Sequence, residues 1–145
     1  MGMASQAGRR KEVEIRVLGA TGIEDFHAHL IRLDRMSRFP RTDDRAIDAH
    51  CLELLASGAI LIGVYEDGVI RAGAEIVPDR TARRAEAAIT VEDRYIDRGF
   101  ERELTERVIE EARRHHLNNL RLHEQSSVRT YKLPTFELKV VAASG

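Results

Sequence analysis

The sequence predicts one α+β domain built on a mixed central sheet of about six strands, with helices against its faces. Its 145 residues suffice for one hydrophobic core and are too few for two domains of ordinary size. Hydrophobic residues make up 43% and charged residues 32%, the balance of a folded globular protein. Strand-like and helix-like periods alternate, with a strand–helix–strand unit late in the chain. We expect residues 1–10 to be a disordered tail and residues 11–145 to form the domain.

The first third of the chain predicts one strand followed by two helices. VEIRVLG, residues 13–19, alternates apolar and polar side chains, as a half-buried strand does. From Gly22 to Leu33, and again from Ile47 to Leu55, apolar residues recur at helical spacing. Asp43 or Asp44 is suited to cap the second helix, because a short carboxylate accepts hydrogen bonds from first-turn N–H groups.

The rest of the chain predicts a hairpin and then alternating strands and helices. AILIGVY (59–65) and VIRAGAEIV (69–77) flank an Asp-Gly pair, which tight hairpin turns favour. The later elements expected from the apolar periods are a strand at 84–91, a long helix from Phe100 to near His116, a strand at 118–124, a short helix from Ser126 or Ser127 through Leu133, and a strand at 136–142.

Charge and composition argue against several classes of function. The net charge of −1, with arginines interspersed among acids, argues against bulk nucleic-acid binding. The longest apolar run, residues 59–65, is far shorter than a membrane span, and the N-terminus lacks a secretory pattern. We therefore expect a cytoplasmic protein that binds neither nucleic acid nor membrane. The single cysteine, Cys51, excludes an internal disulfide, and the histidines lack metal-ligand spacing.

The stretch RYIDRGFERELTERVIEEAR, residues 94–113, predicts an anion-binding loop. A glycine precedes a long helix there, so backbone N–H groups and the positive end of the helix dipole would face a phosphate. Glu101, however, places a carboxylate where such loops usually keep a glycine.

From residue 12 onward, the order of elements resembles the GNAT superfamily of N-acetyltransferases. The superfamily signature [Q/R]-x-x-G-x-[G/A] falls on residues 96–101, where only Gly99 matches and Ile96 and Glu101 differ. The flanks agree better, at Val91, Tyr95, Arg98 and Leu104. The resemblance implies acetyl-CoA as co-substrate, its diphosphate held by the loop. The residues that it assigns to cofactor binding are Val91, Arg98, Gly99, Phe100, Glu101 and Arg102.

The loop is thus a degenerate form of the superfamily pattern. Glu101 adds a side chain and a negative charge at the second glycine position, which opposes a diphosphate by crowding and repulsion. The repulsion corresponds to about 1 kcal/mol, or roughly a tenfold loss of affinity, which Arg98 and Arg102 can offset in part. Alternatively, Glu101 is a first-turn acid that favours the helix dipole.

AEAAITV, residues 85–91, resembles the Ala-Glu-x-Ala-x-x-Val pattern of the protein-lysine acetyltransferase branch. The resemblance implies that Glu86 is the general base that deprotonates the acceptor amine. Strand alternation places Glu86, Ala88 and Thr90 on one face. A solvent-facing carboxylate without a catalytic role is the alternative, because glutamate is usually exposed.

YKLPTF, residues 131–136, is in the register of the superfamily's Y-x-x-L-G-F. The resemblance implies that Tyr131 is the general acid that returns a proton to the departing thiolate. Pro134 and Thr135 replace the Leu-Gly pair, so the turn into the last strand differs. A tyrosine that packs its ring and leaves its hydroxyl in water is the alternative.

Two functions follow from these patterns. The first is an N-acetyltransferase that moves the acetyl group of acetyl-CoA to a primary amine, either a protein lysine or a small amine. The second is a catalytically impaired GNAT-fold module for binding or regulation. The chain stops soon after the last expected strand, which leaves a sheet edge that a homodimer would cover.

Overall fold

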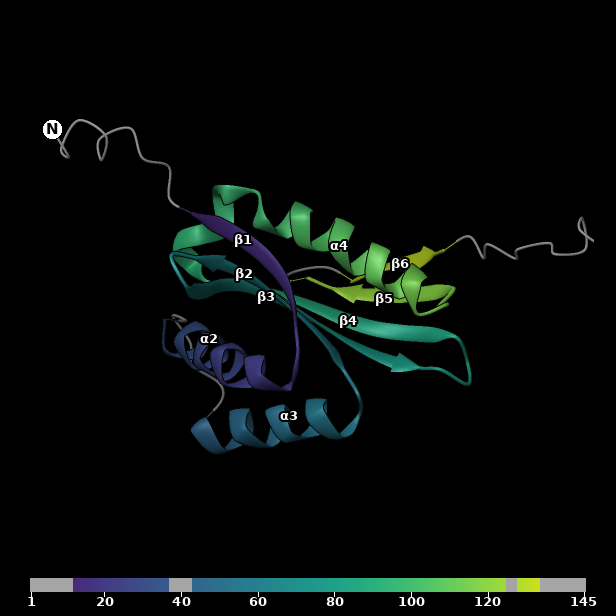
Figure 1. The fold of residues 1–145 in the computed structure, drawn as a ribbon, viewed down its shortest axis with the longest axis horizontal. Coiled ribbons are helices and arrows are strands. Elements are labelled where there is room, and N and C mark those ends of the chain that lie inside the picture. The colour runs from purple at the N-terminus through teal and green to yellow at the C-terminus, as the bar shows by residue number, and fades with distance from the viewer. Residues whose placement is uncertain (1–11, 37–42, 125–127, 134–145) are drawn as a thin grey trace, which may run out of the picture.

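The computed structural model describes residues 12–36, 43–124 and 128–133, and shows helices on both faces of one sheet (Figure 1). None of the helices in these ranges is long and apolar enough to cross a bilayer. The elements are β1 (Val13–Leu18), η1 (Ala20–Gly22), α2 (Ile23–Met36), α3 (Asp44–Ala56), β2 (Ile60–Glu66), β3 (Val69–Asp79), β4 (Arg84–Val91), η2 (Asp93–Arg98), α4 (Phe100–Arg114), β5 (Asn119–His123) and β6 (Val128–Lys132).

The sheet is mixed, as expected, and its strands follow the order β1-β2-β3-β4-β5-β6. Four of the neighbouring pairs are antiparallel, and β4 and β5 are parallel because α4 crosses over between them. The Asp-Gly hairpin is confirmed: Asp67 and Gly68 both have positive φ, 51° and 82°, the conformation of a two-residue turn of this type. Asp43 caps α3, because its side chain accepts a hydrogen bond from the N–H of Ala46.

The short helix expected before Leu133 is wrong. Residues Val128–Lys132 form the strand β6, which pairs with β5 in antiparallel register, Leu120 opposite Tyr131. Two physical reasons favour the strand. Val, Thr and Tyr in VRTYK have side chains that suit a pleated surface, and the free edge of β5 offers unpaired backbone groups. Ser126, Ser127 and the strand expected at 136–142 lie outside the described residues.

The core has one cluster on each face of the sheet. Leu104 and Val108 of α4 pack against alternate residues of β4, among them Ala87 and Ile89. On the other face, Phe26 of α2 packs with side chains of α3, β2 and β3. Figure 1 shows α4 on one side of the sheet and α2 and α3 on the other. The remaining residues of β4, from Glu86 to Thr90, therefore project toward the side of α2, as the alternation predicts.

Candidate functional site

The parallel pairing of β5 with β4 covers only part of β4. Their register runs from Arg84 opposite Asn119 to Ala88 opposite His123, whereas the pairing of β4 with β3 continues to Val91. Within the described residues, Ile89–Val91 thus have a strand neighbour on one side only. Their unpaired backbone groups leave hydrogen-bonding capacity for a ligand beside η2.

The segment after this opening presents the N-terminus of α4. Gly99 has φ 81° and ψ 5°, a left-handed conformation that favours glycine, and precedes the helix without a side-chain cap. The first hydrogen bond of the helix runs from the Glu103 N–H to the Gly99 carbonyl at 3.2 Å. The N–H groups of the preceding first-turn residues have no intrahelical partner, so together with the helix dipole they favour an anion.

Arg98 and Arg102, the two arginines assigned to cofactor binding, already have partners. Arg98 donates to Glu66 Oε2 at 2.9 Å, and Glu66 is only 3% exposed. The Arg98 guanidinium also lies 5.4 Å from the centroid of the Tyr95 ring. Arg102 pairs with Glu106 at 3.6 Å on the exposed side of α4. Among the described residues, neither arginine forms an ion pair with Glu101.

Glu86 lies where β4 is paired with both β3 and β5, and its side chain is 64% exposed. Arg121 Nη1 and His123 Nε2 on β5 approach its Oε1 at 3.7 and 3.8 Å. A groove of 610 Å³ runs alongside and is lined in part by Val77 and Thr130. Figure 1 shows the β3–β4 hairpin extending past α2 and α3, which explains why Glu86 is uncovered. The carboxylate is accessible to a ligand and to water.

Tyr131 lies on the opposite face of the sheet from Glu86. It pairs with Leu120, and residues directly opposite each other in a sheet project to the same side. Leu120 is fully buried in the cluster beneath α4, and Tyr131 packs against that cluster. The structure therefore does not bring the side chains of Glu86 and Tyr131 together, and their roles as base and acid stay predictions.

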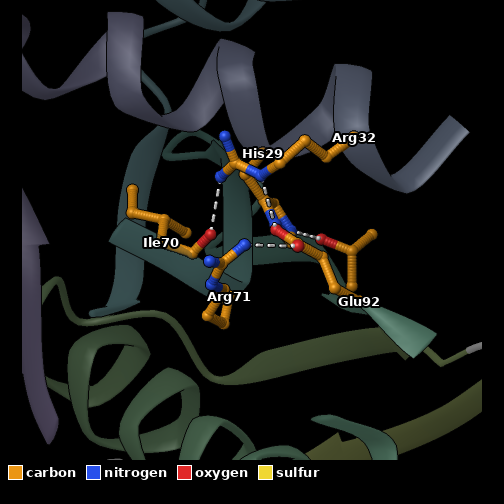
Figure 2. A network of polar contacts seen from close by, with 6 residues as sticks. His29, Arg32, Ile70, Arg71 and Glu92 are labelled. Carbon is orange, nitrogen blue, oxygen red and sulfur yellow. Dashed lines mark hydrogen bonds and ion pairs between the residues drawn. The ribbon is translucent and has the colours of Figure 1, made fainter. Parts of the chain in front are cut away.

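A buried polar cluster at the end of β4 was missed by the sequence analysis (Figure 2). Glu92 is 1% exposed, yet its carboxylate has contacts with three side chains. His29 Nδ1 lies 2.9 Å and Arg32 Nε 3.1 Å from Oε2, both from α2. Arg71 Nη1 of β3 lies 3.1 Å from Oε1. The His29 ring is completely buried, and its Nε2 bonds to Thr90 Oγ1 at 2.9 Å.

The cluster keeps Glu92 ionised. Burial by itself raises the pKa of this carboxyl group, but the hydrogen bond from His29 and the charge of Arg32 outweigh burial and lower the pKa below its ordinary value. One signal in the sequence could have located His29: it follows Phe26 by one helical turn on the apolar stripe of α2. No comparable signal marks Glu92.

No protein-family model and no curated protein sequence matches this chain. Solved structures do match. A GNAT family acetyltransferase from Brucella melitensis in complex with acetyl-CoA aligns with a TM-score of 0.68, 10% identity, 86% of this chain and 90% of that chain. The ribosomal-protein-S18-alanine N-acetyltransferase from Escherichia coli aligns at 0.60 and 16%, over 92% and 74%. A GNAT family acetyltransferase from Streptococcus pneumoniae aligns at 0.59 and 20%, over 77% and 74%. The chain therefore has the GNAT fold.

Proposed function

We propose that this chain is an acetyl-CoA-dependent N-acetyltransferase whose acceptor is a primary amine, either a protein lysine or a small amine. The observation that carries the proposal is the end of the β4–β5 pairing at Ala88, which leaves the last three residues of β4, next to η2 and the N-terminus of α4, with no paired strand on that side among the described residues. This arrangement combines unpaired strand backbone with anion-favouring N–H groups. The matched structures include two with acetyl-CoA and one with coenzyme A.

The proposal assigns cofactor binding mainly to backbone. The N–H groups from Arg98 to Glu101 would receive the diphosphate, and the N–H of Val91 would bond to the pantetheine arm or the thioester. The residues present fit such a group, since Gly99 is exposed and a Cβ at that position would meet nothing within 4 Å. Acetyl-CoA supplies an activated acetyl group as a thioester.

Glu86 is the proposed general base. An amine must lose a proton to attack a carbonyl carbon, and a solvent-accessible carboxylate beside an open groove can take that proton directly or through water. Tyr131 is the proposed source of the proton that the departing thiolate takes up. We also retain the expectation of a homodimer, which equilibrium sedimentation can test.

A calorimetric titration tests the proposal. We expect acetyl-CoA to bind at submillimolar to millimolar concentration, weakened by Glu101. Glu101→Gly should tighten binding about tenfold, because it removes a side chain from the loop together with a charge repulsion of about 1 kcal/mol. Glu103→Gly is the matched control: it also replaces a first-turn glutamate by glycine, but outside the signature hexad. Absence of binding by both the wild type and Glu101→Gly would contradict the proposal.

The alternative is a binding or regulatory module that has lost catalysis. One observation favours it: Glu86 and Tyr131, the residues proposed as base and acid, project from opposite faces of the sheet. The two functions differ in turnover. With acetyl-CoA and a mixture of primary amines, an enzyme releases free thiol at a rate that Glu86→Gln lowers by about a hundredfold or more. A binding module takes up acetyl-CoA, or fails to, without releasing thiol.

A further inference from the structure

The segment η2, which joins β4 to α4, is held at both of its ends by buried acids. At its start, Glu92 immediately precedes the segment and bonds to Arg71. At its end, Arg98 is the last residue of the segment and bonds to Glu66 on β2. Both carboxylates are almost completely buried, at 1% and 3% exposure. A buried carboxylate requires a charged partner, so each acid constrains the arginine that it faces.

The same two arginines also contact the middle of the segment. Arg71 and Arg98 lie 5.2 and 5.4 Å from the centroid of the Tyr95 ring, within the range of a cation–π interaction. The Tyr95 ring in turn stacks on Phe100, the first residue of α4, with centroids 6.3 Å apart. A continuous set of contacts therefore runs from Glu92 through Arg71 and Tyr95 to the beginning of α4.

The far side of Glu92 is anchored on another element. His29 and Arg32 of α2 bond to its Oε2, and Arg32 Nη2 also donates to the carbonyl of Ile70 at 2.8 Å (Figure 2). The carboxylate of Glu92 therefore links Arg71 of β3 to α2. Glu92 is buried, and its oxygens already accept hydrogen bonds from three side chains. It therefore cannot exchange a proton directly with a substrate.

We propose that Glu92 and Arg71 are positioning residues for the cofactor loop. Glu92, anchored on α2 by His29 and Arg32, holds the Arg71 guanidinium against Tyr95, and this contact sets the position of η2 and of the first turn of α4. The inference rests on the proposed function, since it takes this loop as the place where the diphosphate binds. Loss of either residue frees the loop without removing any group that touches the cofactor.

Amide hydrogen exchange tests the positioning role without any ligand. We expect Arg71→Gln and Glu92→Gln to speed exchange at residues 93–98 by about tenfold, because each loses a hydrogen bond between charged groups. Arg71→Gln is the safer variant, since Arg71 is partly exposed and Glu92 keeps His29 and Arg32.

Glu75→Gln is the matched control for the exchange experiment. Glu75 on β3 forms another histidine–glutamate pair on the same sheet face, with His50 of α3 at 2.9 Å. Among the described residues it forms no hydrogen bond or ion pair with η2. It should leave exchange at residues 93–98 unchanged. Equal exchange in Arg71→Gln and Glu75→Gln, or faster exchange only in proportion to lost global stability, would overturn the inference.

Titration with coenzyme A forms the second arm. We expect Arg71→Gln to raise the dissociation constant about tenfold and Glu75→Gln to leave it unchanged. The titration is done under conditions in which urea denaturation shows that both variants are folded. An unchanged constant in Arg71→Gln would overturn the positioning role. If the wild type itself does not bind, the proposed function fails, while the exchange experiment still decides whether Glu92 and Arg71 hold the loop.

Discussion

Two glutamates, Glu86 near the start of β4 and Glu92 directly after its end, have opposite environments. Glu86 and Glu92 are an even number of residues apart, so strand alternation directs both toward the side of α2. Glu86 is 64% exposed, and the nitrogens of Arg121 and His123 lie 3.7 and 3.8 Å from its carboxylate. Glu92 is 1% exposed and has three partners at 2.9 to 3.1 Å. The difference arises because α2 covers one end of the strand and leaves the other end open.

The comparison shows that the motif and the electrostatic environment single out different residues. Glu86 belongs to the pattern that suggests a catalytic base, and its side chain is exposed to water. Glu92 belongs to no sequence motif, yet the fold buries its carboxylate and surrounds it with three hydrogen-bond partners. An accessible carboxylate suits chemistry, whereas a buried one with its bonds satisfied suits positioning. Their energetic roles should therefore differ sharply.

The largest expected contrast is in stability. Glu92→Ala leaves Arg32 and Arg71 without their buried counter-charge and should lower the free energy of unfolding by about 3 to 5 kcal/mol. Glu86→Ala removes only an exposed ion pair and should change it by less than about 1 kcal/mol. Urea denaturation of both variants measures the contrast. Similar losses would mean that α2 does not bury Glu92 in solution.

A smaller contrast is expected for two threonines. Thr90→Val keeps the shape of the side chain but leaves the buried His29 Nε2 without its partner, which should cost about 1 to 3 kcal/mol. Thr130→Val makes the same change at an exposed position beside the groove near Glu86, where the expected cost is under about 0.5 kcal/mol. Equal midpoints of thermal unfolding in the two variants would contradict the hydrogen bond seen here.

The third contrast concerns pH. Because the folded state lowers the pKa of Glu92, its ionised form stabilises the protein above the unfolded pKa of about 4.3, and this contribution is lost as the pH falls through the lower, folded value. Glu92→Gln lacks the titrating group. The difference in unfolding free energy between wild type and Glu92→Gln should therefore shrink below about pH 4. Urea denaturation of both proteins at a series of pH values around 4 measures this difference. A difference in unfolding free energy that does not change with pH would contradict the prediction.

Much of the fold was predictable because its signals are local. The strand expected at 84–91 has those bounds in the structure, since an apolar residue occupies every second position, at Ala85, Ala87, Ile89 and Val91. The hairpin at Asp67 and Gly68 and the cap at Asp43 were also predictable, because turn and cap chemistry depends on residues adjacent in the chain. In the same way, Gly99 marked the start of α4.

The misses involve partners far apart in the chain. The segment around Tyr131 was expected to be helical, yet the free edge of β5 makes it a strand and directs its ring toward α4. His29 and Glu92 are 63 residues apart, and only the packing of α2 on the sheet brings them together. Neither a period nor a motif records such a contact.

The sequence by itself determined the order of the main strands and helices from β1 to β5, the strand faces and the loop that resembles a GNAT cofactor site, because these depend on period, turn residues and short motifs. The tertiary structure alone decided which glutamate is buried and that Tyr131 projects away from Glu86. It also decided that Arg98 pairs with a buried acid of β2. Burial and charge pairing depend on which surfaces meet, and surfaces meet only once the chain has folded.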